Sequence, residues 1–536
     1  MDKYNIPEEA GVSLTEFDIQ DIAKILKHYR TTPTLRDDYT AIFDMACDYK
    51  ARGETSSDED FIRHPDGKEI AVVGMSTLYV RKSYRKLYKQ VFAQQSHCMI
   101  TGSSGIGLSC FLVYMAIRRL AESDDEEPAI IFFLPKGTSN YYCFCGTLFQ
   151  CMGSSEDFQP FFDRPDIWRF VDGNSGFRLS KSPIVVAASP RTVSEETGFK
   201  TFDKVLRIIY HMAPWSQHEL ETCRNIIFPT LENELMLKIF DKVGGVPRVV
   251  LWQASKWHKE YPNNSEMVMD ECFLRIESAI RQIRSAVDLM HCLGEDPNFV
   301  FISSQLIHFW PIPGKKFRKV QRRWASNHIM DKIEESFKGE LMRRMKTELA
   351  TRTSWDESKG TLFETFVSLT LRSGGITLRA RELNEDRDKE QRKERIALPA
   401  NPPIQYIRIP ANLADLSSRE QLIIPTVPNF PVADFFLMPD TIFQVMTSIE
   451  HPPLRNELIQ IVENMPAYRD SKKSKIRLYF VVPQQIFATF EYQKYRVTKK
   501  NKGTDIDSTE LAKNKSKVLN RVEQWVLCID YQIKHK

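Results

Sequence analysis

The order of apolar and polar positions along the chain predicts an α/β protein. Continuous apolar runs, typical of strands buried on both faces of a parallel sheet, occur at 129–134, 168–172 and 182–189. Apolar residues at helical spacing precede and separate these runs, first within 14–25 and again from Phe111 onward. Such alternation favours an open α/β sheet, which binds ligands at the carboxyl ends of its strands.

The second half of the chain predicts another α/β unit. Its expected elements are a helix at 360–371, strands at 428–437 and 441–447, a helix at 452–465 and a final buried strand at 475–483. The segment 379–403 is charged and rich in breakers, which predicts an exposed loop. Residues 255–351 are expected to be mainly helical, with a short strand-like interruption at 301–311.

A glycine-rich loop follows the apolar stretch 98–101 and precedes a helical pattern. It contains Gly102, Gly105 and Gly107 and is followed by Ser109. Glycine allows the backbone to take positive φ and to turn N–H groups toward an anion at a helix N-terminus. Gly102 and Gly107 have the spacing of a Walker A phosphate loop, in which Ser109 would supply the hydroxyl ligand of Mg²⁺.

Leu108 leaves other interpretations of this loop open, because it stands where a Walker A loop has its lysine. The loop also resembles that of short-chain dehydrogenases, although it is one residue shorter. The Tyr-x3-Lys pair of those enzymes occurs here only at Tyr468/Lys472 and Tyr495/Lys499. A glycine-rich turn that binds no ligand is the third interpretation.

Two further residues are candidates for the same site. Asp172 closes the apolar run 168–172, where a carboxylate could hold hydrated Mg²⁺ or simply begin a turn. Arg248 ends the segment that begins at Gly244, and it could reach a γ-phosphate. With the loop glycines and Ser109, these residues predict a site for Mg²⁺ with ATP or GTP.

Composition narrows the class of protein. The 536 residues are 42% hydrophobic, enough for packed cores, and a net charge of +4 says little about nucleic acid. The 10 cysteines contain no Cys-x2-Cys pair, which disfavours a zinc site and favours a reducing, intracellular compartment. No apolar stretch approaches the length of a membrane span, and the first residues lack a secretory apolar core, so neither a membrane partner nor conventional secretion is expected.

Several motifs occur in a characteristic order in the first half. They are Tyr79-Val-Arg81-Lys-Ser-Tyr84, the glycine loop with Ser109, Val171-Asp172-Gly173, Ser189-Pro190-Arg191, Trp215-Ser216-x2-Glu219 and Gly244-Gly245-Val246-Pro247-Arg248. In this order they resemble the NTPase module of Crinkler-type and retrotransposon-hot-spot (RHS) proteins. The resemblance implies an AAA/STAND-like P-loop domain in which Ser109, Asp172 and Arg248 serve Mg²⁺ and phosphate. Leu108 departs from the lysine of the family.

Polar residues of the second half suggest metal-dependent hydrolysis. Phosphodiester hydrolysis needs a hard divalent cation held by carboxylate and carbonyl oxygens. The order of helix, strands and helix in this region resembles a PD-(D/E)XK nuclease core, and the resemblance implies that Asp434 is the principal Mg²⁺ ligand, with Glu364 and the carbonyl of Val445 completing the shell. In the nuclease motif, the position of Gln444 is often a glutamate, and the position of Met446 is usually a lysine. The alternative is an inert domain in which Asp434 caps a turn and Glu364 belongs to the core.

The order helix, two strands, helix, strand resembles a PD-(D/E)XK nuclease core, a restriction-endonuclease-like α/β domain. Phe443-Gln444 and His451-Pro452 also match the C-terminal nuclease domain of the Crinkler/RHS group. The resemblance implies an intracellular effector or toxin-type protein that cleaves DNA, in many cases in a host nucleus. Expected partners are double-stranded DNA bound with low specificity, a nucleotide and a second copy of the chain. The basic tail 494–521 could bind nucleic acid or direct nuclear import.

The combined prediction has four parts. They are a helical segment and linker at 1–70, a degenerate P-loop domain at 71–250, a helical region at 251–350 and a nuclease-like domain with a basic tail at 351–536. The predicted function is a metal-dependent DNA endonuclease coupled to a nucleotide-binding module with impaired ATP hydrolysis. The alternative is a nucleotide- and DNA-binding scaffold whose two active sites have decayed, which Leu108 and Met446 favour. An active NTPase without nuclease activity is a third hypothesis.

Overall fold

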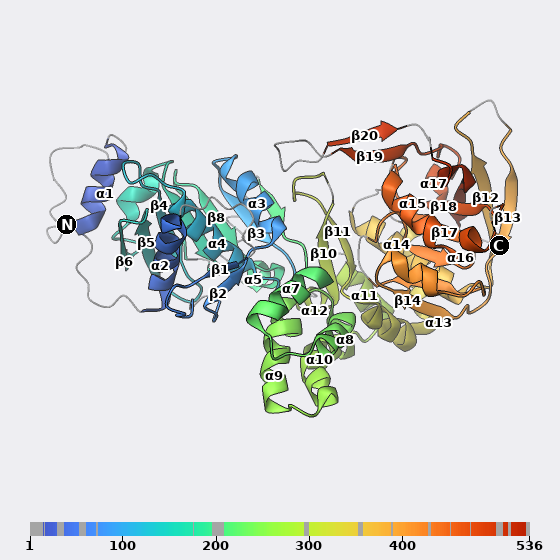
Figure 1. Ribbon diagram of the computed structural model, residues 1–536, viewed down its shortest axis with the longest axis horizontal. Coiled ribbons are helices and arrows are strands. Elements are labelled where there is room, and N and C mark those ends of the chain that lie inside the picture. The colour runs from blue at the N-terminus through green and yellow to red at the C-terminus, as the bar shows by residue number, and fades with distance from the viewer. Residues whose placement is uncertain are drawn as a thin grey trace. The chain divides into compact units, whose positions relative to one another are not determined.

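The chain forms two compact units in a computed structural model (Figure 1). The first comprises residues 1–282 and 296–325, and the second comprises 283–295 and 326–536. The structure describes residues 14, 17–28, 37–52, 61–70, 73–174, 176–195, 208–293, 300–312, 314–351, 357–386, 390–426, 430–450, 452–471, 473–499, 508–512 and 516–531. Within these ranges no helix combines the length and the apolar character needed to cross a bilayer. The four-part division stays a prediction.

The first unit contains a seven-stranded sheet, flanked by helices and followed by a helical region. Its elements up to the last sheet strand are α1 Ile19–His28, α2 Asp37–Ala51, β1 Phe61–Arg63, β2 Thr77–Tyr79, α3 Lys82–Phe92, β3 Cys98–Thr101, α4 Leu108–Ala121, β4 Ile130–Leu134, β5 Asn140–Cys145, β6 Phe149–Ser154, η2 Gln159–Asp163, β7 Trp168–Asp172, β8 Ile184–Ala187, α5 Pro190–Glu195 and β9 Ile209–His211. The later elements are α7 Gln217–Ile227, α8 Asn233–Val243, η3 Arg248–Gln253, α9 Ala254–Glu260, α10 Ser265–Gln282, α12 Val300–Leu306, β10 Ile307–Pro311 and β11 Val320–Trp324.

The strand order of this sheet is β6-β5-β4-β7-β8-β3-β9. Strands β4, β7, β8, β3 and β9 are parallel, whereas the hairpin β5–β6 extends the sheet in antiparallel fashion. The central strands are buried along their whole length and are mainly apolar, as expected for strands covered on both faces, although β7 also contains Arg169 and Asp172. The carboxyl ends of β3, β7 and β8 therefore meet at one edge of the sheet. The expectation of an open α/β sheet is confirmed for this unit.

The second unit contains an eight-stranded sheet of order β13-β12-β21-β18-β17-β16-β15-β14. Its elements are α11 Ala286–Leu293, α13 Asn327–Thr351, α14 Glu357–Ser373, β12 Thr377–Leu383, β13 Lys393–Ala397, β14 Ile404–Ile407, η5 Pro410–Asp415, β15 Leu422–Pro425, β16 Phe435–Leu437, β17 Thr441–Val445, α15 Arg455–Asn464, α16 Pro466–Asp470, β18 Ile476–Pro483, α17 Gln484–Phe487, β19 Tyr495–Lys499, β20 Ser508–Ala512, η6 Leu519–Arg521 and β21 Val522–Ile529. Strands β17, β18 and β21 are parallel, and α15 connects the first two. The unit is mixed α/β, as predicted.

The structure corrects several of the predicted elements. The segment 379–403 is not a loop, because it carries β13 and most of β12, which pairs with β21. The strand 476–483 is not the last one, since β21 follows it and lies between β12 and β18. In the region 255–351, the expected strand-like interruption at 301–311 begins with helix α12 and ends with strand β10, and β10 pairs with β11, a second strand that was not expected.

Candidate functional site

The glycine loop lies between β3 and α4 and is held by its carbonyl groups. Trp215 Nε1 donates to the carbonyl of Ile106 at 2.8 Å, and Tyr84 Oη donates to that of Gly107 at 2.9 Å. The backbone N–H of Arg248 donates to the carbonyl of Gly105 at 3.3 Å. Because these partners approach the carbonyl side of the loop, its N–H groups remain available for an anion at the start of α4.

Close packing around the loop requires its glycines. Gly105 and Gly107 have φ of 84° and 97°, in the left-handed region that favours glycine. A Cβ on Gly107 would lie 2.7 Å from Tyr84 Oη, and one on Gly102 would lie 2.7 Å from the carbonyl oxygen of Met212. The conformation of the loop is thus fixed by contacts with segments that are distant in sequence.

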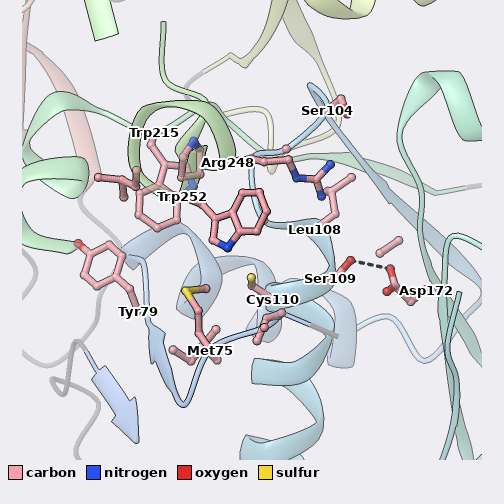
Figure 2. Close-up of a pocket in the computed structure, with 18 of the residues that line it drawn as sticks. Met75, Tyr79, Ser104, Leu108, Ser109, Cys110, Asp172, Trp215, Arg248 and Trp252 are labelled. Atoms are coloured by element: carbon pink, nitrogen blue, oxygen red, sulfur yellow. Dashed lines mark hydrogen bonds between the residues drawn. The ribbon is translucent and has the colours of Figure 1, made fainter. Parts of the chain in front are cut away.

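Ser109 and Asp172 meet at the polar end of the loop. Ser109 Oγ donates a hydrogen bond of 2.8 Å to Asp172 Oδ1 (Figure 2). Burial raises the pKa of Asp172 above its usual 3.8, although the hydrogen bond from Ser109 and the charges of Lys136 and Arg248 oppose this shift. The structure therefore brings together the hydroxyl and the carboxylate that the sequence predicted for Mg²⁺.

A cavity of about 380 Å³ extends from this pair and is lined by loop and helix residues of the first unit. Gly105, Gly107, Ser109, Asp172 and Arg248 line it, whereas Gly102 is not among the lining residues. Leu108 also faces the cavity, and Figure 2 shows the Arg248 guanidinium beside it. Volumes of this size are typical of small-molecule sites.

The opposite end of the cavity is apolar and aromatic. Met75, Tyr79, Trp215 and Trp252 line it on the side away from Asp172 (Figure 2). Trp215 and Tyr79 are buried, but 47% of Trp252 is exposed. Trp252 and Arg248 belong to the π-helical segment η3, a feature frequent at functional sites. The cavity thus joins a polar end, beside the glycine loop, to an aromatic surface that suits a planar ring.

An ion pair ties this aromatic end to the segment before the loop. Arg81 donates to both carboxylate oxygens of Glu219, at 2.8 and 2.9 Å, and to the carbonyls of Ala213 and Pro214. Glu219 also completes a capping box with Ser216 at the start of α7. These motif residues therefore position Trp215 over the glycine loop, a role that sequence reasoning did not assign to them.

The donor set at Ser109 and Asp172 fits Mg²⁺. This ion usually keeps several waters and is held by one or two carboxylates together with substrate phosphates. Asp172 is the carboxylate among the described residues that line the cavity. In the described part of the chain, no group of three or more His, Cys, Asp or Glu side chains forms a dedicated metal site. Mg²⁺ would therefore depend on phosphate oxygens for the rest of its shell.

In the second unit, Asp434 and Gln444 lie on neighbouring strand segments. The backbone N–H of Asp434 donates to the carbonyl of Phe443, and the N–H of Val445 donates to Asp434 Oδ2 at 2.7 Å. The structure thus shows the N–H of Val445 on Asp434, and the expectation that the Val445 carbonyl is a metal ligand stays a prediction. Gln444 is 7% exposed, and its Oε1 is buried without a hydrogen-bond partner.

Met446 and Glu364 have different surroundings. Met446 joins a core cluster with Ile442 and with Leu458 of α15, so this face of β17 is packed where a lysine was looked for. Glu364 is half-buried on α14, whose Gly360 approaches the end of β17: a Cβ there would lie 3.8 Å from Thr447 Oγ1. The hydrogen bonds of Asp434 join it to the Gln444 strand, and Glu364 lies on α14.

Other predicted residues contribute less. His451 and Lys472 lie outside the described residues, as do several lysines of the basic tail, namely Lys500, Lys502, Lys513 and Lys515. The described parts of that tail form β19, β20 and η6 rather than a terminal helix. Tyr468 and Tyr495 belong to the second unit, whereas the glycine loop belongs to the first, so the loop unit itself contains no dehydrogenase Tyr-x3-Lys pair.

Comparison with known proteins gives only distant likenesses. No protein-family model matches the chain, and no curated protein matches it. Among solved structures, the Thermotoga maritima RuvB Holliday junction branch migration motor is 12% identical over 45% of this chain and 92% of its own, with a TM-score of 0.26. The Aeropyrum pernix ORC2 protein, solved as ADPNP–ADP complexes, is 10% identical over 60% of this chain and 90% of its own, with a TM-score of 0.23. Since scores this low relate chains only loosely, the nucleotide site is inferred from the geometry of this chain.

Proposed function

We propose that the first unit binds a nucleoside triphosphate with Mg²⁺ in the cavity beside the glycine loop and hydrolyses it slowly or not at all. The supporting observation is the fixed loop, whose carbonyl groups are occupied at Gly105, Ile106 and Gly107 while its N–H groups stay available. Arg248 adds a positive charge in the same cavity, and the N-terminus of α4 adds its dipole.

The proposed Mg²⁺ would bind through Ser109 and Asp172, and it would neutralise charge on the phosphates. In that arrangement Ser109 would present its hydroxyl oxygen to the ion. Asp172 would orient this hydroxyl or a water molecule bound to the ion. Fast hydrolysis also needs a group that orients the attacking water. The residue after Asp172 is Gly173, which has no side chain for this role. Asp172 is the only carboxylate among the described residues lining the cavity. Together with Leu108, this favours binding over turnover.

A titration of the full chain with Mg²⁺·ATP and Mg²⁺·GTP, followed by calorimetry, tests this proposal. Arg248→Ala is expected to weaken binding about tenfold, corresponding to about 1.4 kcal/mol. Arg281→Ala is the matched control, because Arg281 lies on the exposed face of α10 and pairs with Glu277. Phosphate release should stay at the background rate. Absence of nucleotide binding, or equal binding by both variants, would contradict the proposed site.

As a second function, we propose metal-dependent DNA cleavage by the second unit. The observation that favours it is the placement of Asp434 beside the strand of Gln444, with the buried Gln444 Oε1 left without a partner. Asp434 would hold Mg²⁺ with Glu364 of α14. Met446 carries no charge. Lys359, a lysine of α14 in the same unit, is buried, with 1% of the residue exposed. DNA and a second copy of the chain are the partners that this proposal expects.

Plasmid cleavage with Mg²⁺ or Mn²⁺ tests the nuclease proposal. Asp434→Asn is the suitable variant, because its amide oxygen can still accept the N–H of Val445. Asp415→Ala is the control, since Asp415 is exposed on η5. Cleavage should disappear in Asp434→Asn and persist in Asp415→Ala. If the wild type does not cleave DNA but binds it with a steep salt dependence, the decayed scaffold is the better description.

The intracellular effector class and a nuclear site of action belong to the same proposal. They rest on the Crinkler/RHS-like order of motifs in the sequence; of these motif residues, Tyr84 and Trp215 hydrogen-bond the glycine loop, and Arg81 pairs with Glu219.

A further inference from the structure

Lys136 lies in a short turn that is fixed against the end of β7. Asn174 Nδ2 donates to the carbonyl of Pro135 at 2.9 Å and to that of Thr138 at 2.6 Å. Gly137 between them has a φ of 74°, which lets the turn close. A single amide group thus holds both ends of the turn, so the backbone of Lys136 has a defined position.

The side chain of Lys136 crosses the end of β7. Leu134 pairs with Val171 in the parallel ladder, so two residues further on Lys136 stands opposite Gly173. A Cβ on Gly173 would lie 3.5 Å from Cδ and 3.9 Å from Cε of Lys136. The aliphatic part of the Lys136 side chain therefore lies across Gly173, at ordinary contact distance from where a Cβ would stand.

The ammonium group of Lys136 reaches the polar end of the nucleotide cavity. Lys136 lines this cavity together with Leu108, Ser109 and Arg248. Its charge acts on the Asp172 carboxylate, on which it favours the ionised form. Lys136 is exposed and makes neither a hydrogen bond nor an ion pair with any described residue. The charge is thus available to a ligand.

We propose that Lys136 binds the terminal phosphate of the nucleotide and thereby supplies the charge that Leu108 does not. This inference rests on the proposed nucleotide binding by the first unit. The lysine would approach the phosphate from β4, across Gly173, rather than from the first turn of α4. A flexible ammonium group can contact phosphate as a point charge from either direction.

The site would therefore hold the phosphates between opposed groups. The loop N–H groups and α4 would act from one side, Arg248 from the π-helical segment η3, and Lys136 from the turn that follows β4. Because Lys136 and Asp172 line the same polar end of the cavity, a ligand would place its terminal phosphate there, and the contribution of Lys136 should depend on the number of phosphates in the ligand.

Calorimetric titration of the full chain with the Mg²⁺ complexes of ATP, ADP and AMP tests this assignment. Lys136→Met should weaken ATP binding about tenfold and leave AMP binding nearly unchanged, since only ATP carries the terminal phosphate. Lys136→Arg should keep ATP affinity within about threefold, because the charge remains. Lys181→Met is the matched control, because Lys181 is also an exposed lysine and precedes β8, at the opposite edge of the sheet. This variant should bind ATP as the wild type does.

The outcomes separate this inference from the proposed function on which it rests. If the wild type binds ATP and Lys136→Met binds it equally well, the Lys136 assignment is overturned and the nucleotide site stands. Equal losses for ATP and AMP would likewise overturn it, because they indicate a general disturbance of the cavity. If the wild type binds none of the three nucleotides, both the site and the assignment are wrong.

Discussion

The ion pair between Arg81 and Glu219 allows a quantitative test of how the loop is held. Arg81 is 2% exposed and Glu219 is 19% exposed, so both charges lie largely out of water. Arg81→Met keeps the length and the apolar part of the side chain but removes the guanidinium. The carboxylate of Glu219 and the carbonyls of Ala213 and Pro214 would then lose the hydrogen bonds that Arg81 donates to them.

The expected cost follows from these contacts. Removing one partner of a buried pair typically costs about 3–5 kcal/mol, and the partial exposure of Glu219 favours the lower value, about 3 kcal/mol. Glu219→Gln keeps the side-chain oxygen for the capping box and should cost about 2 kcal/mol. The double variant should cost about 3 kcal/mol, since no unpaired charge remains. The coupling energy between the two residues is therefore expected to be about 2 kcal/mol.

Hydrogen–deuterium exchange of the full chain across a urea series provides the measurement, read on peptides of β3 and α4 so that the first unit is observed by itself. ATP affinity of the same variants should fall together with loop protection, because Trp215 is positioned through this pair. An Arg81→Met effect below about 1 kcal/mol, or strictly additive effects in the double variant, would refute this account of the buried pair.

Further predictions concern pH, packing and the Asp172 carboxylate. Burial raises the pKa of Glu219, but the charge and hydrogen bonds of Arg81 outweigh this effect and hold the pKa below 4.5. The stability that the ion pair gives is therefore present above pH 4.5 and is lost as the pH falls through the pKa of Glu219 in the folded protein. Acid titration of the wild type and of Glu219→Gln would measure this loss. Gly245→Ala should destabilise the first unit by about 2–4 kcal/mol, because the new Cβ would lie 2.0 Å from the carbonyl oxygen of Trp215, and urea unfolding would show it. Gly339→Ala, on the exposed face of α13 with no atom within 4 Å, should instead stabilise the second unit by about 0.5–1 kcal/mol in the same experiment. Since burial raises the pKa of Asp172, the stability linked to this group is lost as the pH rises through that pKa; Asp172→Asn should raise the melting temperature at pH 7 and abolish the Mg²⁺ dependence of ATP binding, as calorimetry would show.

The strands that could be predicted are those in which apolar residues follow one another with few polar interruptions. Strands β4, β7 and β8 carry their pattern in consecutive residues, so a short window suffices to find them. Strand β12 was mistaken for a loop because charged and apolar residues alternate in it, with Leu378, Ala380 and Leu383 buried between arginine and glutamate side chains. The strand β21, with its buried Trp525, directly follows the basic segment 494–521, and it was not predicted because the polar composition of that segment favours an exposed tail.

The candidate site was predictable where a motif keeps its residues close in sequence. The loop spacing points to Ser109, and the end of an apolar run points to Asp172. The groups that hold the loop come from elsewhere: Trp215 stands 109 positions from Ile106, and no local pattern connects them. Lys136 was not predicted for the same reason, because its approach to Gly173 depends on the pairing of β4 with β7.

The hydrogen bonds that Trp215 and Tyr84 donate to the loop have a consequence for how such a site can change over evolutionary time. They make the shape of the loop independent of the residue at position 108, since neither bond involves its side chain. A change of the residue at position 108, such as lysine to leucine, therefore leaves both hydrogen bonds in place. It alters the group that the first turn of α4 presents to the cavity, and the fold can accept it without loss of either contact.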